Sequence, residues 1–385
     1  MRSNKLLIKF SVIFIGAFLG LFILEVSLHF YTIKDLWGLS RIAMGERLTD
    51  CQVKDARLHH KLIRSCVGVL KAKEYETEIA TNSFGFRDDD IRAKDSKIFR
   101  VLIVGDSFAE GWGVEITERF DTIAEKILDD AMGGDKVDII NTGTRSYSPI
   151  LELEFLKENV GKLKPDLVIA FFDLSDLHDD YYYGGWKRYF RMKEDLGFGT
   201  DTFVEVWPPP EPPLTTFLLK SRLFQVVHSE VGTEILNRRK KLTRTNLSWD
   251  ISLFAKANDW ENFDKSWNLN IANLNLIGDF LKTKSIDYAV TVVPRGNYID
   301  AKEWDSGREA LGIERQKLYE PRPIDTIMEE LGKSGIATLE LYNPLRQSNV
   351  FPLYYPFDGH WTIDGHKIVG DELARFLANK IDGND

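Results

Sequence analysis

The chain contains only two cysteines among its 385 residues, Cys51 and Cys66. Their spacing is not that of a zinc motif, and the sequence offers no further cysteine that would complete a thiolate site. Basic residues are also in the minority, because 50 lysines and arginines stand against 59 aspartates and glutamates, for a net charge of −9. A protein that binds nucleic acid needs a positive surface, so the composition argues against DNA or RNA as a partner.

Two short motifs, distant from each other in the chain, carry the groups of a nucleophilic centre. Gly-Asp-Ser at 105–107 directly follows the apolar run 101–104, and Asp-Gly-His at 358–360 lies near the C-terminus. A serine hydroxyl is a poor nucleophile until a base takes its proton, and an imidazole does this when a carboxylate holds it in the right tautomer. Either tripeptide alone is most often a turn. At a strand end and ahead of the last helix, the two together predict a Ser-His-Asp centre.

The residues around both motifs resemble those of the SGNH/GDSL hydrolase superfamily. The stretch 105–114 is similar to the first block of that family. The stretch 358–362, followed by a Gly-His pair at 365–366, resembles the last block in its membrane-anchored bacterial members, and 82–87 resembles a segment that precedes the Gly-Asp-Ser strand in them. The resemblance extends over residues 75–380 or so. It implies Ser107 as nucleophile, His360 as base and Asp358 as the residue that orients the imidazole.

Two positions depart from the family pattern. The second block usually has a glycine five residues after its asparagine, but here Asn141 leads to Ser146. The third block usually ends in Asn-Asp, but here Ser175 stands before Asp176. In the family that glycine amide and that asparagine side chain help to form the oxyanion hole. The resemblance therefore assigns the hole to Ser107, to the backbone N–H of Ser146 and to the hydroxyl of Ser175. Loss of one such donor costs about 3 kcal/mol of transition-state stabilisation, so the two serines affect the rate more than the fold.

The N-terminus predicts a membrane anchor. Residues 10–24 contain no charge, and the mostly apolar stretch 6–30 has the length of about 20 residues that a transmembrane helix needs. Basic residues at 2, 5 and 9 precede the span, which places the N-terminus in the cytoplasm and the remaining chain in the periplasm, outside the inner membrane. A cleaved signal peptide is the alternative, but no small-x-small cleavage site with suitable flanks follows the apolar run.

The two cysteines lie between this anchor and the main domain. In an oxidising compartment they could form a disulfide that closes a loop of about 15 residues, worth about 3 kcal/mol in the chain-entropy model. Two unrelated buried thiols are the alternative.

The main domain follows an α/β pattern, in which five apolar runs alternate with helical periodicity. The runs are 99–104, 137–141, 166–172, 288–293 and 337–342, and the helical stretches are 120–132, 150–163, 267–282, 324–331 and 364–380. This alternation predicts a doubly wound, mostly parallel five-stranded sheet in a flavodoxin-like three-layer sandwich. Ligands bind such sheets at the carboxyl ends of the strands, where Ser107 and the acidic segment 173–180 both fall.

The sequence divides into an anchor with its cytoplasmic tip at 1–31, an extension with the cysteine pair at 32–96, and a catalytic domain at 97–385. An insertion after the third strand, at about 181–262, begins with the aromatic run 181–186 and includes a proline-rich stretch at 207–213. Its tyrosines and tryptophans could form a glycan-binding rim, and a lid with an ordinary aromatic core is the alternative. No metal and no cofactor is expected, because acidic loops more often bond to water or to their own backbone.

The sequence thus predicts a membrane-anchored serine esterase or O-acyltransferase that forms an acyl-Ser107 intermediate. Hydrolysis and transfer use the same residues, so both stay open. Resemblance to O-acetyltransferases of the alginate and peptidoglycan type implies an acetyl ester of a polysaccharide outside the cytoplasm. The expected partners are the acylated glycan or lipid substrate, the inner membrane and a membrane protein that donates the acyl group. One rival is a catalytically silent glycan-binding or polysaccharide-assembly protein, suggested by Ser146 and Ser175, and another is a lipase or lysophospholipase.

Overall fold

The computed structural model describes residues 16, 19–22, 47–48, 51–134, 136–198, 264–308 and 313–383. The chain divides into two compact units, residues 1–47 with 209–248 and residues 48–208 with 249–385, and nearly all described residues belong to the second. Most of the predicted transmembrane stretch and the proline-rich part of the insertion lie outside the described residues. Within the described ranges, no helix combines the length and the apolarity that a membrane span requires.

A five-stranded parallel sheet forms the centre of the described unit, as the sequence predicts. Its strands are β6 (Phe99–Gly105), β7 (Val137–Asn141), β8 (Leu167–Phe172), β9 (Asp287–Val292) and β10 (Ala337–Leu339). They lie in the order β10-β9-β8-β6-β7, and every neighbouring pair is parallel. All six residues of β8 are buried, because helices cover both faces of the sheet and leave no position for a polar, solvent-facing side chain.

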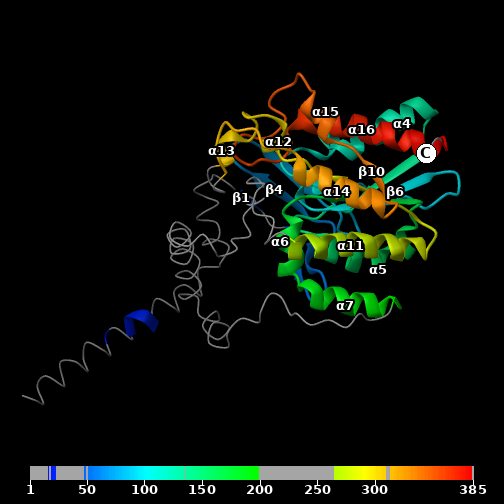
Figure 1. Ribbon diagram of the computed structural model, residues 1–385, viewed down its shortest axis with the longest axis horizontal. Helices are drawn as coiled ribbons and strands as arrows, with labels where there is room; N and C mark the ends of the chain where they lie inside the picture. Colours follow the sequence, from blue (N-terminus) through cyan, green and yellow to red (C-terminus); the bar gives the residue numbers. More distant parts are fainter. Residues whose placement is uncertain are drawn as a thin grey trace, which may run out of the picture. The chain divides into compact units, whose positions relative to one another are not determined.

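The helices form a layer on each side of this sheet (Figure 1). On one side α4 (Phe120–Met132) packs against α16 (Ile363–Ile381), and on the other α11 (Asp264–Lys282) packs against α5 (Pro149–Leu163) and α14 (Arg322–Lys333). If the five strands are numbered along the chain, their order across the sheet, read from β7, is 2-1-3-4-5, which is the flavodoxin-like order. The strand order therefore reverses between β6 and β8, and the crevice at their carboxyl ends is where such folds bind ligands.

Shorter helices lie in the connections that follow the strands of this sheet. They are α3 (Ser107–Glu110), the 3₁₀ helix η1 (Ile116–Glu118), α6 (Asp176–Tyr182), α7 (Gly185–Asp195), α12 (Gly296–Ile299), α13 (Asp305–Arg308) and α15 (Tyr342–Arg346). Helices α6 and α7 occupy the start of the predicted insertion, so this part of it is helical.

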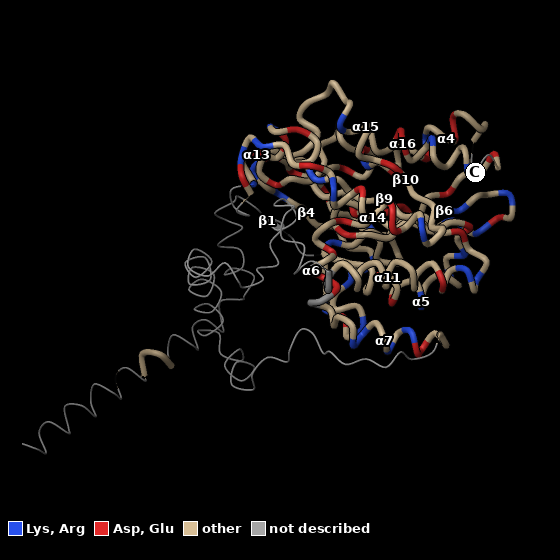
Figure 2. Tube along the Cα trace, viewed as in Figure 1, with Lys and Arg blue, Asp and Glu red and all other residues tan. Residues whose placement is uncertain are grey.

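The extension before the sheet contributes strands that the sequence pattern did not reveal. They are β1 (Arg47–Leu48), β2 (Gln52–Asp55), β3 (His59–Leu62), β4 (Val67–Lys71) and β5 (Glu76–Ala80). The pairs β2–β3 and β4–β5 are antiparallel, and in β3, β4 and β5 buried and exposed residues alternate. Basic and acidic residues are interspersed along these strands and along the rest of the described chain (Figure 2).

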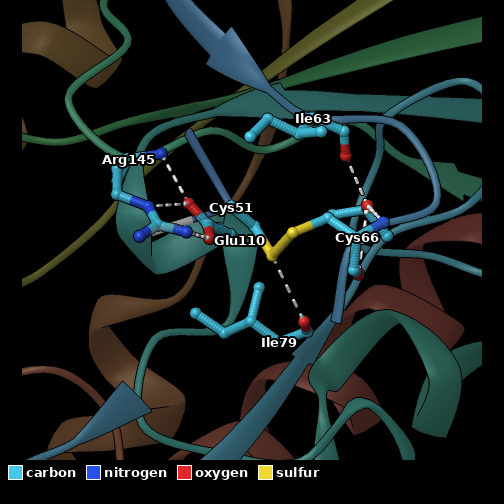
Figure 3. Close-up of a disulfide and its surroundings, with 7 residues drawn as sticks. Cys51, Ile63, Cys66, Ile79, Glu110 and Arg145 are labelled. Carbon is cyan, nitrogen blue, oxygen red and sulfur yellow. Dashed lines mark hydrogen bonds and ion pairs between the residues drawn. A yellow bond between two sulfur atoms is a disulfide. The ribbon is translucent and has the colours of Figure 1, made fainter. Parts of the chain in front are cut away.

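Cys51 and Cys66 form a disulfide that joins the beginning of β2 to the beginning of β4. Their Cα atoms are 5.8 Å apart, and Figure 3 shows the bond beside Ile79 and the Glu110–Arg145 pair. The sequence had left this pairing open. The disulfide belongs to a small apolar cluster, separate from the main core, which also contains Leu70, Ile79 and Trp112.

Removal of this disulfide should lower the free energy of unfolding by about 3 kcal/mol, because the open chain gains the entropy of a 15-residue loop. Urea unfolding with and without a reductant measures the change. The double variant Cys51→Ser/Cys66→Ser is the control, since its unfolding should match the reduced protein and ignore the reductant. Equal midpoints for the oxidised and reduced protein would contradict this prediction.

Candidate active site

Ser107 is the first residue of α3, immediately beyond the carboxyl end of β6. Asp106 caps this short helix, because its Oδ1 accepts a hydrogen bond of 2.8 Å from the N–H of Phe108. The turn from strand to helix requires glycine at position 105. A Cβ there would lie 2.8 Å from the Cβ of Ala109 and 2.9 Å from the Cβ of Phe171, which is closer than side-chain atoms approach. The turn thus presents the Ser107 hydroxyl at the edge of the sheet.

Asp358 and His360 lie in a tight turn directly before α16. The turn is closed by a hydrogen bond of 3.0 Å from the N–H of Gly359 to the carbonyl of Tyr355, and Gly359 has a φ of 87°. Asp358 Oδ1 accepts the backbone N–H of His360 at 3.1 Å. This Asx-type turn bends the two side chains toward each other, as their spacing in the sequence predicts.

The three predicted residues come together in a line. The Oγ of Ser107 lies 2.7 Å from Nε2 of His360, and Nδ1 of His360 lies 2.5 Å from Oδ1 of Asp358. The side chains of His360 and Asp358 are 19% and 10% exposed, so both groups are largely buried. Both ring nitrogens are therefore engaged, one by the hydroxyl and the other by the carboxylate.

The ionisation of this pair favours a charged carboxylate beside a basic imidazole. Burial alone would raise the pKa of Asp358, but the His360 ring and the Tyr75 hydroxyl lower that pKa to about 2. Burial would likewise lower the pKa of His360, but the charge and the hydrogen bond of Asp358 outweigh burial and raise it. An imidazole with a raised pKa is a stronger base than a free histidine, which suits proton removal from Ser107.

Ser146 lies in a loop that packs closely against α3. The N–H of Thr144 donates to the carbonyl of Gly105 at 3.0 Å, and a Cβ on Gly143 would lie 2.4 Å from the backbone nitrogen of Glu110. Ser146 itself is exposed and has a φ of 61°, in the left-handed region that favours glycine. The loop thus gives a serine the backbone conformation for which the family pattern has glycine. Its part in an oxyanion hole stays a prediction.

The hydroxyl of Ser175 points to a neighbouring carboxylate. It donates to Oδ2 of Asp173 at 2.5 Å, and the backbone N–H of Ser175 donates to the same oxygen at 3.1 Å. The hydroxyl hydrogen of Ser175 is therefore directed at Asp173 in this structure. The predicted role of this hydroxyl as an oxyanion donor requires it to leave that partner.

Arg295 is a member of the site that the motif analysis missed. Its Nε donates to Oδ1 of Asp173 at 3.0 Å, and its Nη2 pairs with Oδ2 of the same carboxylate. The guanidinium lies 5.6 Å from the ring centre of Phe108 and 5.8 Å from that of Trp304, within cation–π range. Position 295 directly follows the fourth strand, at the same carboxyl edge as Ser107, and this placement was the available signal.

Two aromatic rings lie beside the imidazole of His360. The rings of Phe108 and Trp112 have their centres 4.6 Å and 6.1 Å from that of His360. Arg145 lies over Trp112 at 4.8 Å and pairs with the buried Glu110. The site therefore has an apolar wall, backed by a buried ion pair.

The other candidates contribute less to this centre. Within the described ranges, no cluster of three or more His, Cys, Asp or Glu side chains is arranged to hold a metal. Of the predicted aromatic rim, Trp186 packs on Phe190 within α7. The side chains at 181–182 and the stretch 207–213 lie outside the described residues, so the rim stays a prediction.

No family model matches the chain, and neither does any curated protein. Solved structures of G-D-S-L lipases and esterases are similar to it. One is a lipase/acylhydrolase from Enterococcus faecalis, at 12% identity and a TM-score of 0.39, covering 74% of this chain and 97% of that one. Others are the acetyl xylan esterase AlAXEase (12%, TM-score 0.37, 72% and 99%) and a G-D-S-L lipolytic protein from Veillonella parvula (9%, TM-score 0.36, 72% and 98%). Likeness at this level does not establish what the chain does.

Replacement of Arg295 by methionine should destabilise the protein by about 3–5 kcal/mol, because the fully buried carboxylate of Asp173 loses its charged partner. Urea unfolding gives the difference. The double variant Arg295→Met/Asp173→Asn removes both charges and should recover part of the loss. A single variant as stable as the wild type would show that the pair contributes little.

Proposed function

We propose that this chain is a serine esterase or O-acyltransferase that works through an acyl-Ser107 intermediate. One observation carries the proposal, namely the line of short contacts from the Ser107 hydroxyl through His360 to Asp358. Such a line activates a hydroxyl that is otherwise a weak nucleophile, and acyl transfer is the chemistry that uses it.

In the proposed reaction, Nε2 of His360 takes the proton of Ser107 while Oγ attacks the acyl carbonyl carbon. The new C–O bond gives a tetrahedral oxyanion, which collapses with release of the alcohol oxygen, and His360 returns the proton to that oxygen. The acyl group is then bound to Ser107 as an ester. A water molecule or a sugar hydroxyl attacks this ester and loses its proton to His360. The second tetrahedral intermediate then collapses with cleavage of the bond to Oγ, and His360 returns the proton to Oγ, which regenerates Ser107. Asp358 keeps its charge and stabilises the imidazolium in both halves.

The backbone N–H groups of Ser107 and Ser146 are the proposed donors to the oxyanion. The left-handed conformation of Ser146 and the close packing of its loop on α3 support this assignment. Ser175 joins them only when its hydroxyl turns away from Asp173. Because one oxyanion donor is worth about 3 kcal/mol of transition-state stabilisation, we expect a slower reaction while the Ser175 hydroxyl stays on Asp173.

We further propose that the substrate is an acyl ester, most simply an acetyl ester, of a glycan outside the cytoplasm. The resemblance of the last block to membrane-anchored glycan O-acetyltransferases supports the substrate class. The Cys51–Cys66 disulfide supports an oxidising compartment such as the periplasm. The apolar N-terminal stretch supports an inner-membrane anchor, and a membrane protein that donates the acyl group is the proposed partner for transfer.

A catalytically silent glycan-binding protein is the second candidate. The hydrogen bond from the Ser175 hydroxyl to Asp173 favours it, since this proton is directed away from an incoming carbonyl oxygen. This candidate predicts saccharide binding that survives the loss of Ser107 and no turnover of any acyl ester.

Treatment of the full-length chain with a fluorophosphonate should modify Ser107, because the probe reacts with hydroxyls that a base has activated. Peptide mass spectrometry locates the adduct. The variants Ser107→Ala and His360→Ala should both lose it, and the wild type should cleave or transfer acetyl groups from acetylated glycans. A folded wild type without an adduct would overturn the enzymatic proposal and leave the binding protein as the better reading.

The labelling rate should fall on the acid side with a midpoint above pH 6.5, the ordinary value for histidine. Only neutral His360 can accept the Ser107 proton, and the carboxylate of Asp358 raises the pKa of that imidazole above 6.5. In Asp358→Asn the raising charge is gone while burial remains, so the midpoint should move to lower pH and the maximal rate should drop. Rates measured between pH 5 and 9 in both proteins test this; an unshifted midpoint in the variant would contradict it.

A further inference from the structure

The turn between β4 and β5 reaches across to the catalytic loop at the other end of the chain. The turn is closed by a hydrogen bond of 2.9 Å from the N–H of Ala72 to the carbonyl of Tyr75. The turn belongs to the N-terminal extension, which contains neither the Gly-Asp-Ser motif nor the Asp-Gly-His motif. Each of its three consecutive residues Lys73, Glu74 and Tyr75 contacts the segment 355–358.

Glu74 holds the backbone of that segment. Its Oε1 accepts the N–H of Phe357 at 3.0 Å, and its Oε2 accepts the N–H of Asp358 at 2.9 Å. The ammonium group of Lys73 lies 4.3 Å from the ring centre of Phe357, a cation–π contact. Two backbone amides and one ring of the catalytic loop are therefore fixed by this one turn.

Tyr75 holds the carboxylate itself. Its hydroxyl donates to Oδ2 of Asp358 at 2.7 Å, while Oδ1 of the same carboxylate faces Nδ1 of His360. Both oxygens of Asp358 thus have a partner, and rotation of the carboxylate would break one contact or the other. A hydrogen bond to a charged group is stronger than one between neutral groups, so this contact restrains the carboxylate firmly.

The turn is itself held in place. Tyr75 packs in the cluster of Cys51, Leu70, Ile79 and Trp112, which contains the disulfide. Its ring lies 4.8 Å from that of Tyr355, whose hydroxyl donates to the carbonyl of Gly113 at 2.8 Å. The β4–β5 hairpin, which the disulfide ties to the start of β2, therefore contacts the loop that carries two of the three catalytic side chains.

We propose that the turn 73–75 is a working part of the active site, in which Tyr75 is the positioning residue that keeps Asp358 facing His360. The proposal rests on the function proposed above. Asp106 at the N-cap of α3 and Arg295 in the loop after β9 also act on His360, and Glu74 and Tyr355 lie close to Asp358. None of these four side chains is replaced in a Tyr75 variant. A change in the titration of His360 in that variant therefore reports on the position of the Asp358 carboxylate.

The test compares Tyr75→Phe with the matched control Tyr355→Phe in the full-length chain. Each variant keeps its ring and loses one hydroxyl from the same cluster, but only the first loses a contact to Asp358. With histidine labelled with nitrogen-15, NMR follows the Nδ1 proton of His360 and its titration, and a His360→Gln variant assigns the signals. These signals do not depend on turnover.

In Tyr75→Phe we expect the Nδ1 proton signal to broaden through faster exchange and the pKa of His360 to fall, because the carboxylate no longer faces the ring at all times. Labelling of Ser107 should slow about tenfold, as expected for a lost hydrogen bond to a charged group. Tyr355→Phe should keep the proton signal and the titration of the wild type. Glu74→Ala should act like Tyr75→Phe, since it frees the backbone of the same loop.

An unchanged signal and titration in Tyr75→Phe, or a rise in the pKa of His360, would overturn the positioning role. A wild type whose Ser107 does not react at all would instead overturn the proposed function, and the NMR comparison would still decide whether Tyr75 positions Asp358. Thermal unfolding of both tyrosine variants checks that they are folded.

Discussion

A single line of hydrogen bonds, from Tyr75 through Asp358 and His360 to Ser107, joins three distant parts of the chain. Each contact lies between 2.5 and 2.7 Å. The contacts at the two ends join distant segments, and the middle contact lies within the turn that carries both Asp358 and His360. At one end of the line, Ser107 lies at the carboxyl edge of the sheet. At the other end, Tyr75 lies in the turn of the β4–β5 hairpin, which the disulfide ties to the start of β2.

Several buried carboxyl groups lie behind Ser107, and burial affects the pKa of most of them in the same direction. Burial raises the pKa of Asp106 to about 7, with Asp173 as a further cause, and it raises the pKa of Glu152 and Asp176 well above the ordinary values. Asp173 stays ionised, because Arg295 outweighs the effect of burial on its pKa. Burial thus favours the neutral form of Glu152 and Asp176, and the charge of Asp173 is matched by Arg295.

The sequence reveals the sheet and three of the four residues of the line, Ser107, Asp358 and His360, because these leave local signals. Each of the five strands is a short apolar run, and the strand-end position of Ser107 and the spacing of Asp358 and His360 are visible without a structure. The hairpins of the extension leave no such signal, since in β3, for example, two histidines and a lysine occupy most of the strand. Tyr75 could not be found, because 283 residues separate it from Asp358 and only the folded chain brings them together. The direction of the Ser175 hydroxyl is likewise a matter of rotation, which composition and spacing do not encode.

Because α16 packs on α4, the site can form only late in the synthesis of the chain. Ser107 is made early in synthesis, but its base is 253 residues further along the chain. His360 reaches the hydroxyl only when the final helix has docked beside α4 and drawn the turn before it to the edge of the sheet. A chain still being synthesised therefore carries Ser107 without His360 beside it, until the turn at 358–360 has been made and α16 has docked.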